Sequence, residues 1–167
     1  MSGSSNDGFA TSMHISVVLS LEEELLPEMA GLEQSFKQKE SQFDHIIKIG
    51  RTYLEDAVPL TLGQEFSGFT TQITYSIERV KAILPALRYP PMRGTAVGTG
   101  LNAHQGFSEA FCETVSAFSG TQFSMAPDKF EAISANDALV NASGVLNTIA
   151  CSLFKIANEI RYEGAGP

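Results

Sequence analysis

The sequence contains three segments whose residue types could do chemistry, and the first lies near the amino end. Ser4, Ser5, Asn6 and Asp7 place hydroxyl, amide and carboxylate groups just ahead of an apolar helical pattern. The first backbone N–H groups of a helix lack intrahelical partners, so this position suits an anion. The same residues also fit a capping box, in which the serine and aspartate side chains satisfy the helix start themselves. The segment therefore predicts a helix start, with anion binding as a second role.

The other two segments connect predicted helices. Residues 50–65 form a long polar connection, and connections of this length inside a compact bundle are often functional. Residues 94–102 are rich in glycine and follow Tyr89-Pro90-Pro91, which marks a helix boundary. No Gly-Lys-Ser/Thr sequence follows these glycines, so nucleotide binding by a phosphate loop is unsupported. We expect both segments to be loops, with the glycines serving backbone geometry near a site.

Length and charge limit the classes of function. The chain has 167 residues and a formal net charge of -8, from 11 Lys and Arg against 19 Asp and Glu. One ordinary hydrophobic core is the expectation at this length. An acidic chain with scattered basic residues repels phosphate backbones, so we expect no nucleic-acid partner.

Metal, redox and membrane roles find little support in the sequence. Cys112 and Cys151 have no partners at metal-ligand spacing, and we expect both to be buried, reduced thiols of an intracellular protein. His14, His45 and His104 are widely separated, which predicts no metal site and a surface or helix-packing role. We also find no apolar stretch approaching the about 18 to 20 residues that a membrane span needs, and no secretory signal.

Apolar residues recur at heptad spacing through most of the chain, which indicates long helices. We predict helices over 12–47, 62–87, 107–119 and about 139–160, the first kinked near Pro27 because proline lacks a backbone donor. Glu22, Glu23 and Glu24 should form a solvated face. No stretch alternates with period two for long, so the predicted fold class is all-α, a long-helix bundle. Helices of this length should be partly covered by other chains, which predicts an oligomer.

Several motifs occur together in one order. They are SSND at 4–7, GRTYLEDAVPLTLGQEFSG at 50–68, GTAVGTGLN at 94–102, APDKFEA at 126–132 and DALVNASGVLNTIACSLFKIANEIR at 137–161. In this order and spacing the chain resembles the class II fumarases of the fumarase and aspartase superfamily, over essentially its whole length. APDKFEA resembles fumarase more than aspartase. The resemblance implies a lyase of the tricarboxylic acid cycle, reversibly hydrating fumarate to L-malate as a homotetramer without a cofactor.

The resemblance also implies roles for particular residues. Ser4, Ser5 and Asn6 match the segment that holds a substrate carboxylate in the family, and Thr52 matches a threonine that contacts substrate in the same pocket. Neutral hydroxyl and amide donors can replace the water around a dianionic four-carbon acid. Such donors would also stabilise the carbanion through which the elimination passes.

Two departures from the family pattern affect catalysis. Tyr53 stands where fumarases carry the histidine that handles the proton of the added water. A tyrosine hydroxyl is mostly protonated at neutral pH, so it can donate a proton but hardly accept one. The family's mobile loop, GSSxMPxKxN, which bears the proton-abstracting serine, has no counterpart in these 167 residues. We therefore expect no useful catalysis from this chain alone.

The implied organisation follows from the same comparison of motifs. We expect residues 1–11 to be a remnant of an amino-terminal domain with the first signature, and residues 12–167 to be the central helical bundle, which is only part of a family chain. The expected compartment is the cytoplasm or the mitochondrial matrix. Two alternatives remain open: a truncated, non-catalytic helical assembly module, and an aspartase-like ammonia-lyase region.

Overall fold

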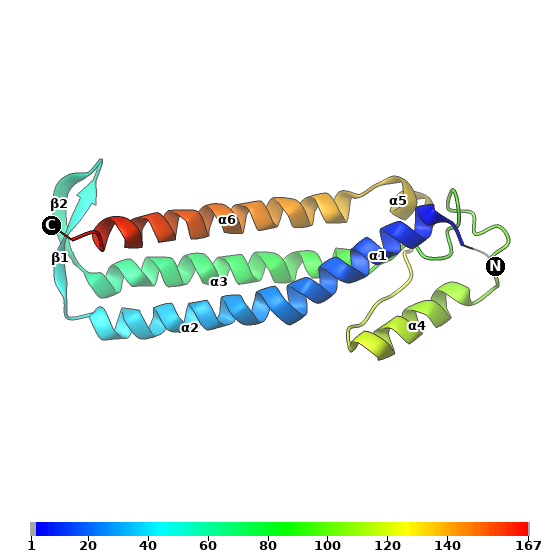
Figure 1. The fold of residues 1–167 in the computed structure, drawn as a ribbon, viewed down its shortest axis with the longest axis horizontal. Helices are drawn as coiled ribbons and strands as arrows, with labels where there is room; N and C mark the ends of the chain where they lie inside the picture. The colour runs from blue at the N-terminus through cyan, green and yellow to red at the C-terminus, as the bar shows by residue number, and fades with distance from the viewer. Residues whose placement is uncertain (1–2, 167) are drawn as a thin grey trace. The chain divides into compact units, whose positions relative to one another are not determined.

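A computed structural model describes residues 3–166 and divides the chain into two compact units. The first unit holds the residues up to Leu25 together with Val80–Val145, and the second holds Leu26–Arg79 together with the residues from Leu146 onward. In chain order the elements are α1 (Ser5–Leu19), the π-helix η1 (Ser20–Leu25), α2 (Leu26–Phe43), β1 (Ile47–Thr52), β2 (Glu55–Thr61), α3 (Leu62–Leu87), α4 (Phe107–Ser119), α5 (Lys129–Ser134) and α6 (Asp137–Glu163) (Figure 1).

Most predicted helices are present in the structure. The helices predicted over 62–87 and 107–119 are confirmed with the same bounds, the second closed by Gly120 in the left-handed conformation. The last helix is confirmed and extends over Asp137–Glu163. The all-α class is confirmed, with one small two-stranded sheet added to the helices.

The prediction of one helix over 12–47 is wrong at both ends, whereas the irregularity predicted near Pro27 is present. The helix begins at Ser5, changes to π geometry over Ser20–Leu25 and ends at Phe43. Pro27 is the second residue of α2, just after the π segment, and its missing backbone donor removes one regular helical hydrogen bond there. The predicted irregularity near Pro27 therefore takes the form of a π-helical segment.

The Glu22–Glu24 run is only partly solvated. Glu23 and Glu24 are exposed, as predicted. Glu22 instead is partly buried, pairs with Arg88 and accepts a hydrogen bond from the Thr121 hydroxyl at 2.8 Å. The uniform solvated face predicted for this run is thus wrong at Glu22, which links η1 to segments far along the chain within the first unit.

An aromatic cluster forms much of the core of the second unit. Phe36 of α2 lies within 6.0 Å of both Phe66 and Phe69 of α3, measured between ring centroids. Lys155 of α6 lies over the Phe69 ring at 5.3 Å. Within this unit α2, α3 and α6 therefore pack together (Figure 1). At the start of α3, Gly63 permits this closeness, because a Cβ there would stand 2.6 Å from the Glu40 carbonyl oxygen.

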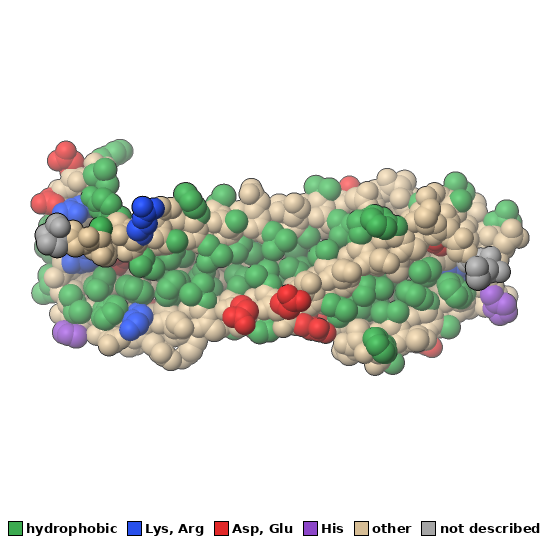
Figure 2. Space-filling model, viewed as in Figure 1, with side chains coloured by type: hydrophobic (Ala, Val, Ile, Leu, Met, Phe, Trp, Pro, Cys, Tyr) green, Lys and Arg blue, Asp and Glu red, His purple; other side chains and the backbone are tan. Residues whose placement is uncertain are grey.

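In the second unit, α6 has one buried apolar line and one exposed apolar line. Ile149 and Ile156 are 3% exposed, whereas Leu146, Leu153 and Ile160 are 41%, 36% and 44% exposed. Hydrophobic side chains are visible on the surface along the long helices (Figure 2). By length and composition α6 could cross a membrane, with a window of mean hydropathy 1.3, so the statement that no stretch approaches a membrane span is wrong. One such helix is weak evidence for a membrane protein.

The two cysteines and the histidines lie in different environments. Cys112 is buried, as predicted, and burial raises the pKa of its thiol despite the opposing charge of Lys129. Cys151 is exposed, so the prediction that it is buried is wrong. His14 is buried and donates through Nδ1 to the Leu87 carbonyl at 2.8 Å, which agrees with a helix-packing role.

Candidate functional site

The SSND motif forms the start of α1. Ser4 is the N-cap, with its hydroxyl accepting from the Asn6 N–H at 3.2 Å. The Asp7 carboxylate accepts from the Ser4 N–H at 3.0 Å, so the predicted capping box is confirmed. Ser5 is exposed, and among residues 3–166 no hydrogen bond of its hydroxyl is present. The capping box and a free hydroxyl thus occur side by side at the helix start.

The same motif connects α1 to the glycine-rich segment 94–102. Oδ2 of Asp7 accepts from the Thr95 N–H at 2.8 Å, and Nδ2 of Asn6 donates to the Ala96 carbonyl at 2.8 Å. Asp7 is only 1% exposed. The predicted loop at 94–102 is confirmed, and its backbone is strained, since Thr95 has a φ of 59°. Gly98, with φ of 106°, leaves room for Phe130 of α5, which a Cβ would approach to 2.9 Å.

Thr52 and Tyr53 lie at the tip of a β-hairpin. The connection predicted as a loop over 50–65 is wrong in this respect, because β1 and β2 pair antiparallel and α3 begins at Leu62. Tyr53 and Leu54 form the turn, with φ of 54° and 64°, as a two-residue hairpin with a type I′ turn requires. Tyr53 is 99% exposed. The hairpin therefore presents both predicted site residues to the outside of the second unit.

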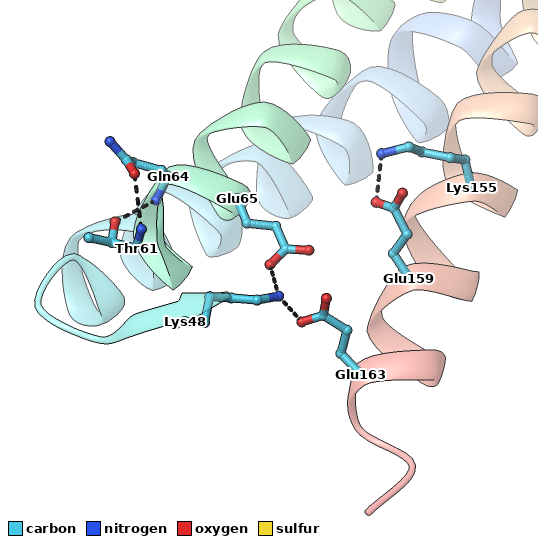
Figure 3. Close-up of polar contacts among 7 residues, drawn as sticks. All are labelled: Lys48, Thr61, Gln64, Glu65, Lys155, Glu159 and Glu163. Atoms are coloured by element: carbon cyan, nitrogen blue, oxygen red, sulfur yellow. Dashed lines mark hydrogen bonds and ion pairs between the residues drawn. The ribbon is translucent and has the colours of Figure 1, made fainter. Parts of the chain in front are cut away.

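Polar contacts attach this hairpin to the helices (Figure 3). Lys48 of β1 donates to Glu65 of α3 at 2.6 Å and also pairs with Glu163 of α6. Burial alone would lower the pKa of Lys48, but hydrogen bonds and charges of the two carboxylates outweigh it and raise that pKa above its usual 10.5. Thr61 and Gln64 form a reciprocal capping box at the start of α3, at 2.9 and 3.1 Å. The hairpin base is thus attached to α3 and α6, while Tyr53 and Leu54 at its tip are exposed.

A cavity of about 790 Å³ lies between the hairpin, α3 and α6 in the second unit. Tyr53 and Arg51 contribute to its wall. Its cations are already paired: Lys48 with Glu65 and Glu163, Arg51 with Asp56, and Lys155 with Glu159. Because each of these three cations is paired with a carboxylate, the cavity offers a dianion no unpaired positive charge.

The predicted site residues fall into two groups. Ser4, Ser5 and Asn6 lie in the first unit, and Thr52 and Tyr53 lie in the second. Within each group the structure brings the residues together at one helix start or one hairpin tip. Among residues 3–166, no three His, Cys, Asp or Glu side chains gather as metal ligands would.

Two polar contacts of these segments are not predictable from the sequence. Asp7 fits the capping box, but no local signal reveals its bond to Thr95, 88 residues away. Lys48 was not singled out, because its partners Glu65 and Glu163 lie 17 and 115 residues away. The short alternation of Ile47 and Ile49 before the turn is the one signal that could have revealed the hairpin.

Known proteins resemble this chain along its whole length. A family model described as Lyase matches residues 1–167. Fumarate hydratase, mitochondrial, from Rhizopus oryzae is 54% identical over 167 residues, covering 100% of this chain and 34% of that protein. Fumarate hydratase, mitochondrial, from Homo sapiens is 52% identical over 166 residues, covering 99% of this chain and 32% of that protein. The chain thus spans about a third of the length of these curated relatives.

Solved structures show the same fold. A recombinant class II fumarase from Schistosoma mansoni matches with a TM-score of 0.97 and 35% identity, over 100% of this chain and 38% of that chain. A fumarate lyase:delta crystallin from Brucella melitensis, bound to cobalt, matches with a TM-score of 0.94 and 36% identity, over 100% and 36% of the two chains. The resemblance to class II fumarase drawn from the motifs is confirmed, and the chain belongs to the lyase family.

Proposed function

We propose that this chain is the central helical region of a class II fumarase, which in the complete protein reversibly hydrates fumarate to L-malate. The observation that supports this most is the match of the entire chain, at 54% identity, to a fumarate hydratase. The 126–132 motif and the hairpin and glycine-rich motifs fall inside that match. The activity belongs to the complete protein, of which this region supplies a part.

Substrate binding is proposed for Ser4, Ser5, Asn6 and Thr52. Among residues 3–166 the Ser5 hydroxyl makes no hydrogen bond, and it lies at the start of α1, where the helix dipole favours an anion. Asn6 and Thr52 are exposed and add an amide and a hydroxyl. Donors of this kind suit a dicarboxylate, and donors aimed at the carboxylate that gains charge would stabilise the transition state.

Tyr53 is proposed as a proton donor at the hairpin tip, in the place of the histidine of other fumarases. Its full exposure and position on a fixed hairpin support a role outside the second unit, toward another part of the assembly. As a phenol it would protonate a leaving or adding oxygen more readily than it would accept a proton. The presence of tyrosine instead of histidine at position 53 therefore affects the step in which water is added.

Assembly into a homo-oligomer, a tetramer by family resemblance, is part of the proposal. The exposed apolar line of Leu146, Leu153 and Ile160 on α6 supports it, since wide apolar surface on a helix favours burial against another chain. Fumarate and L-malate are the proposed small-molecule partners, and no cofactor is proposed. The names of the relatives favour the mitochondrial matrix over the cytoplasm as the compartment.

The test is an assay of the full-length protein that contains this chain. Loss of the ultraviolet absorbance of fumarate, with L-malate formed, is the expected result. Unchanged fumarate together with ammonia release from L-aspartate would instead favour the ammonia-lyase alternative. A correctly assembled protein inert toward both would favour the non-catalytic assembly module.

A further inference from the structure

The Asp7 carboxylate connects two segments of the first unit through backbone groups. Its Oδ1 accepts from the Ser4 N–H at 3.0 Å, and its Oδ2 accepts from the Thr95 N–H at 2.8 Å. The side chain is 1% exposed, and among residues 3–166 no cation pairs with it. A buried carboxylate without a cation is costly unless its oxygens accept strong hydrogen bonds, and here both oxygens do.

The segment held by Asp7 is strained and packed on its other side. Thr95 has a φ of 59°, which is unusual for a β-branched residue, and Arg93 and Asn102 also have positive φ. Such conformations persist only where the surroundings fix them, and they concentrate at functional sites. Gly98 lies against Phe130, so the 94–102 segment is fixed by α5 as well as by Asp7. Asn6 adds a second bond to the same segment, at the Ala96 carbonyl.

We propose that Asp7 is a positioning residue for substrate binding, which fixes Ser4, Ser5 and Asn6 against the 94–102 segment. This inference rests on the proposed function, because it takes Ser4, Ser5 and Asn6 to hold a substrate carboxylate. Asp7 does not touch the substrate. Its two oxygens accept from backbone N–H groups inside the unit, so it orders the polar groups at the helix start. Donors held in one arrangement bind an anion more tightly than mobile ones.

Asp7→Asn separates this role from simple burial. The asparagine side chain has nearly the same shape but only one oxygen, so it can accept from Ser4 or from Thr95 but not from both. Its NH2 group would then face the remaining backbone N–H, and because both groups are donors, no hydrogen bond forms there. The variant therefore breaks one of the two connections and leaves the volume of the core unchanged.

Asp128→Asn is the matched control. Asp128 caps α5 in the same unit, and its Oδ1 accepts from the N–H groups of Phe130 at 2.8 Å and Glu131 at 3.1 Å. Because one oxygen makes both bonds, asparagine preserves them and is an equally good N-cap. This control removes a carboxylate charge from a helix start without breaking a connection to another segment.

The experiment compares the two variants with wild type in the full-length protein. Three quantities are measured: KM for L-malate, kcat for L-malate, and the rate of amide hydrogen exchange over residues 94–102. We expect Asp7→Asn to raise KM about tenfold with kcat changed less than about threefold, and to speed exchange of the segment about tenfold or more, from the loss of one charge-assisted hydrogen bond. Asp128→Asn should leave KM and exchange over 94–102 within about twofold of wild type.

The outcomes that contradict the inference are distinct from those that contradict the function. Unchanged exchange over 94–102 in Asp7→Asn would overturn the connection itself. Faster exchange with a KM no higher than that of Asp128→Asn would overturn the positioning role and leave Asp7 a structural residue. A wild-type protein inert toward fumarate and L-malate would overturn the proposed function, and with it the assignment of this connection to substrate binding.

Discussion

Lys48 on the hairpin donates to Glu65 at the start of α3 at 2.6 Å, and the same ammonium also pairs with Glu163 near the end of α6. A single partly buried cation thus pairs with two carboxylates from different helices. This arrangement ties the hairpin that bears Thr52 and Tyr53 to the helices of its own unit. The stability of the second unit and the placement of the hairpin tip are therefore coupled through Lys48.

Lys48→Met should destabilise the protein, because Glu65 and Glu163 would face each other without a cation. We expect the free energy of unfolding to fall by about 2 kcal/mol in urea denaturation. Lys37→Met is the control, since the exposed Lys37 pairs with Glu33 one helical turn away, and the loss of this pair should cost about 0.5 kcal/mol or less. Equal losses for the two variants would contradict the coupling.

The contribution of Lys48 should persist until strongly alkaline pH. Its pKa is raised in the folded protein, so the folded state holds the proton more tightly than the unfolded state does. The stabilisation is then fully present below the unfolded value of 10.5 and is lost as pH rises through the higher folded value. Above the folded pKa of Lys48, the free energies of unfolding of wild type and Lys48→Met should converge. Convergence already near pH 8 would contradict a raised pKa of Lys48.

The hairpin turn should accept a better turn residue. Leu54 has a φ of 64°, in a region that asparagine tolerates better than leucine. Leu54→Asn should raise the free energy of unfolding by about 0.5 to 1 kcal/mol. Val58→Asn, at a similarly exposed position inside β2, should not stabilise the protein, because asparagine is unfavourable in strands. A loss of stability in Leu54→Asn would mean that the leucine side chain has a contact partner.

The exposed apolar line on α6 should be an assembly surface. Leu153→Glu places a charge in the middle of that line and should shift the protein toward smaller species in analytical ultracentrifugation, with a change of at least about tenfold in the association constant. Gln38→Glu, at an exposed polar position of α2, adds the same charge as a control. An unchanged sedimentation profile in Leu153→Glu would show that this line does not form an interface.

The sequence predicts those features that depend on residues close to one another in the chain, and not those that depend on residues far apart in it. The helix that contains Phe66 and Leu87 follows from heptad spacing, and the capping box of Ser4 and Asp7 follows from local residue types. The hairpin was missed because its turn uses Tyr53 and Leu54 rather than asparagine and glycine, and because its alternating stretch is short. The bonds from Asp7 to Thr95 and from Lys48 to Glu163 span 88 and 115 residues, and no spacing rule reaches that far.

The most direct test of the central claim is a chimera in which these 167 residues replace the corresponding segment of the Rhizopus oryzae fumarate hydratase, to which they are 54% identical. The fumarate hydration rate of the assembled chimera is compared with that of the same chimera carrying Thr52→Val, which keeps the shape of the side chain and removes its hydroxyl. If the chain is the central region of a fumarase, the unmodified chimera should hydrate fumarate at least about tenfold faster than the Thr52→Val chimera. An assembled chimera that leaves fumarate unchanged would contradict the claim.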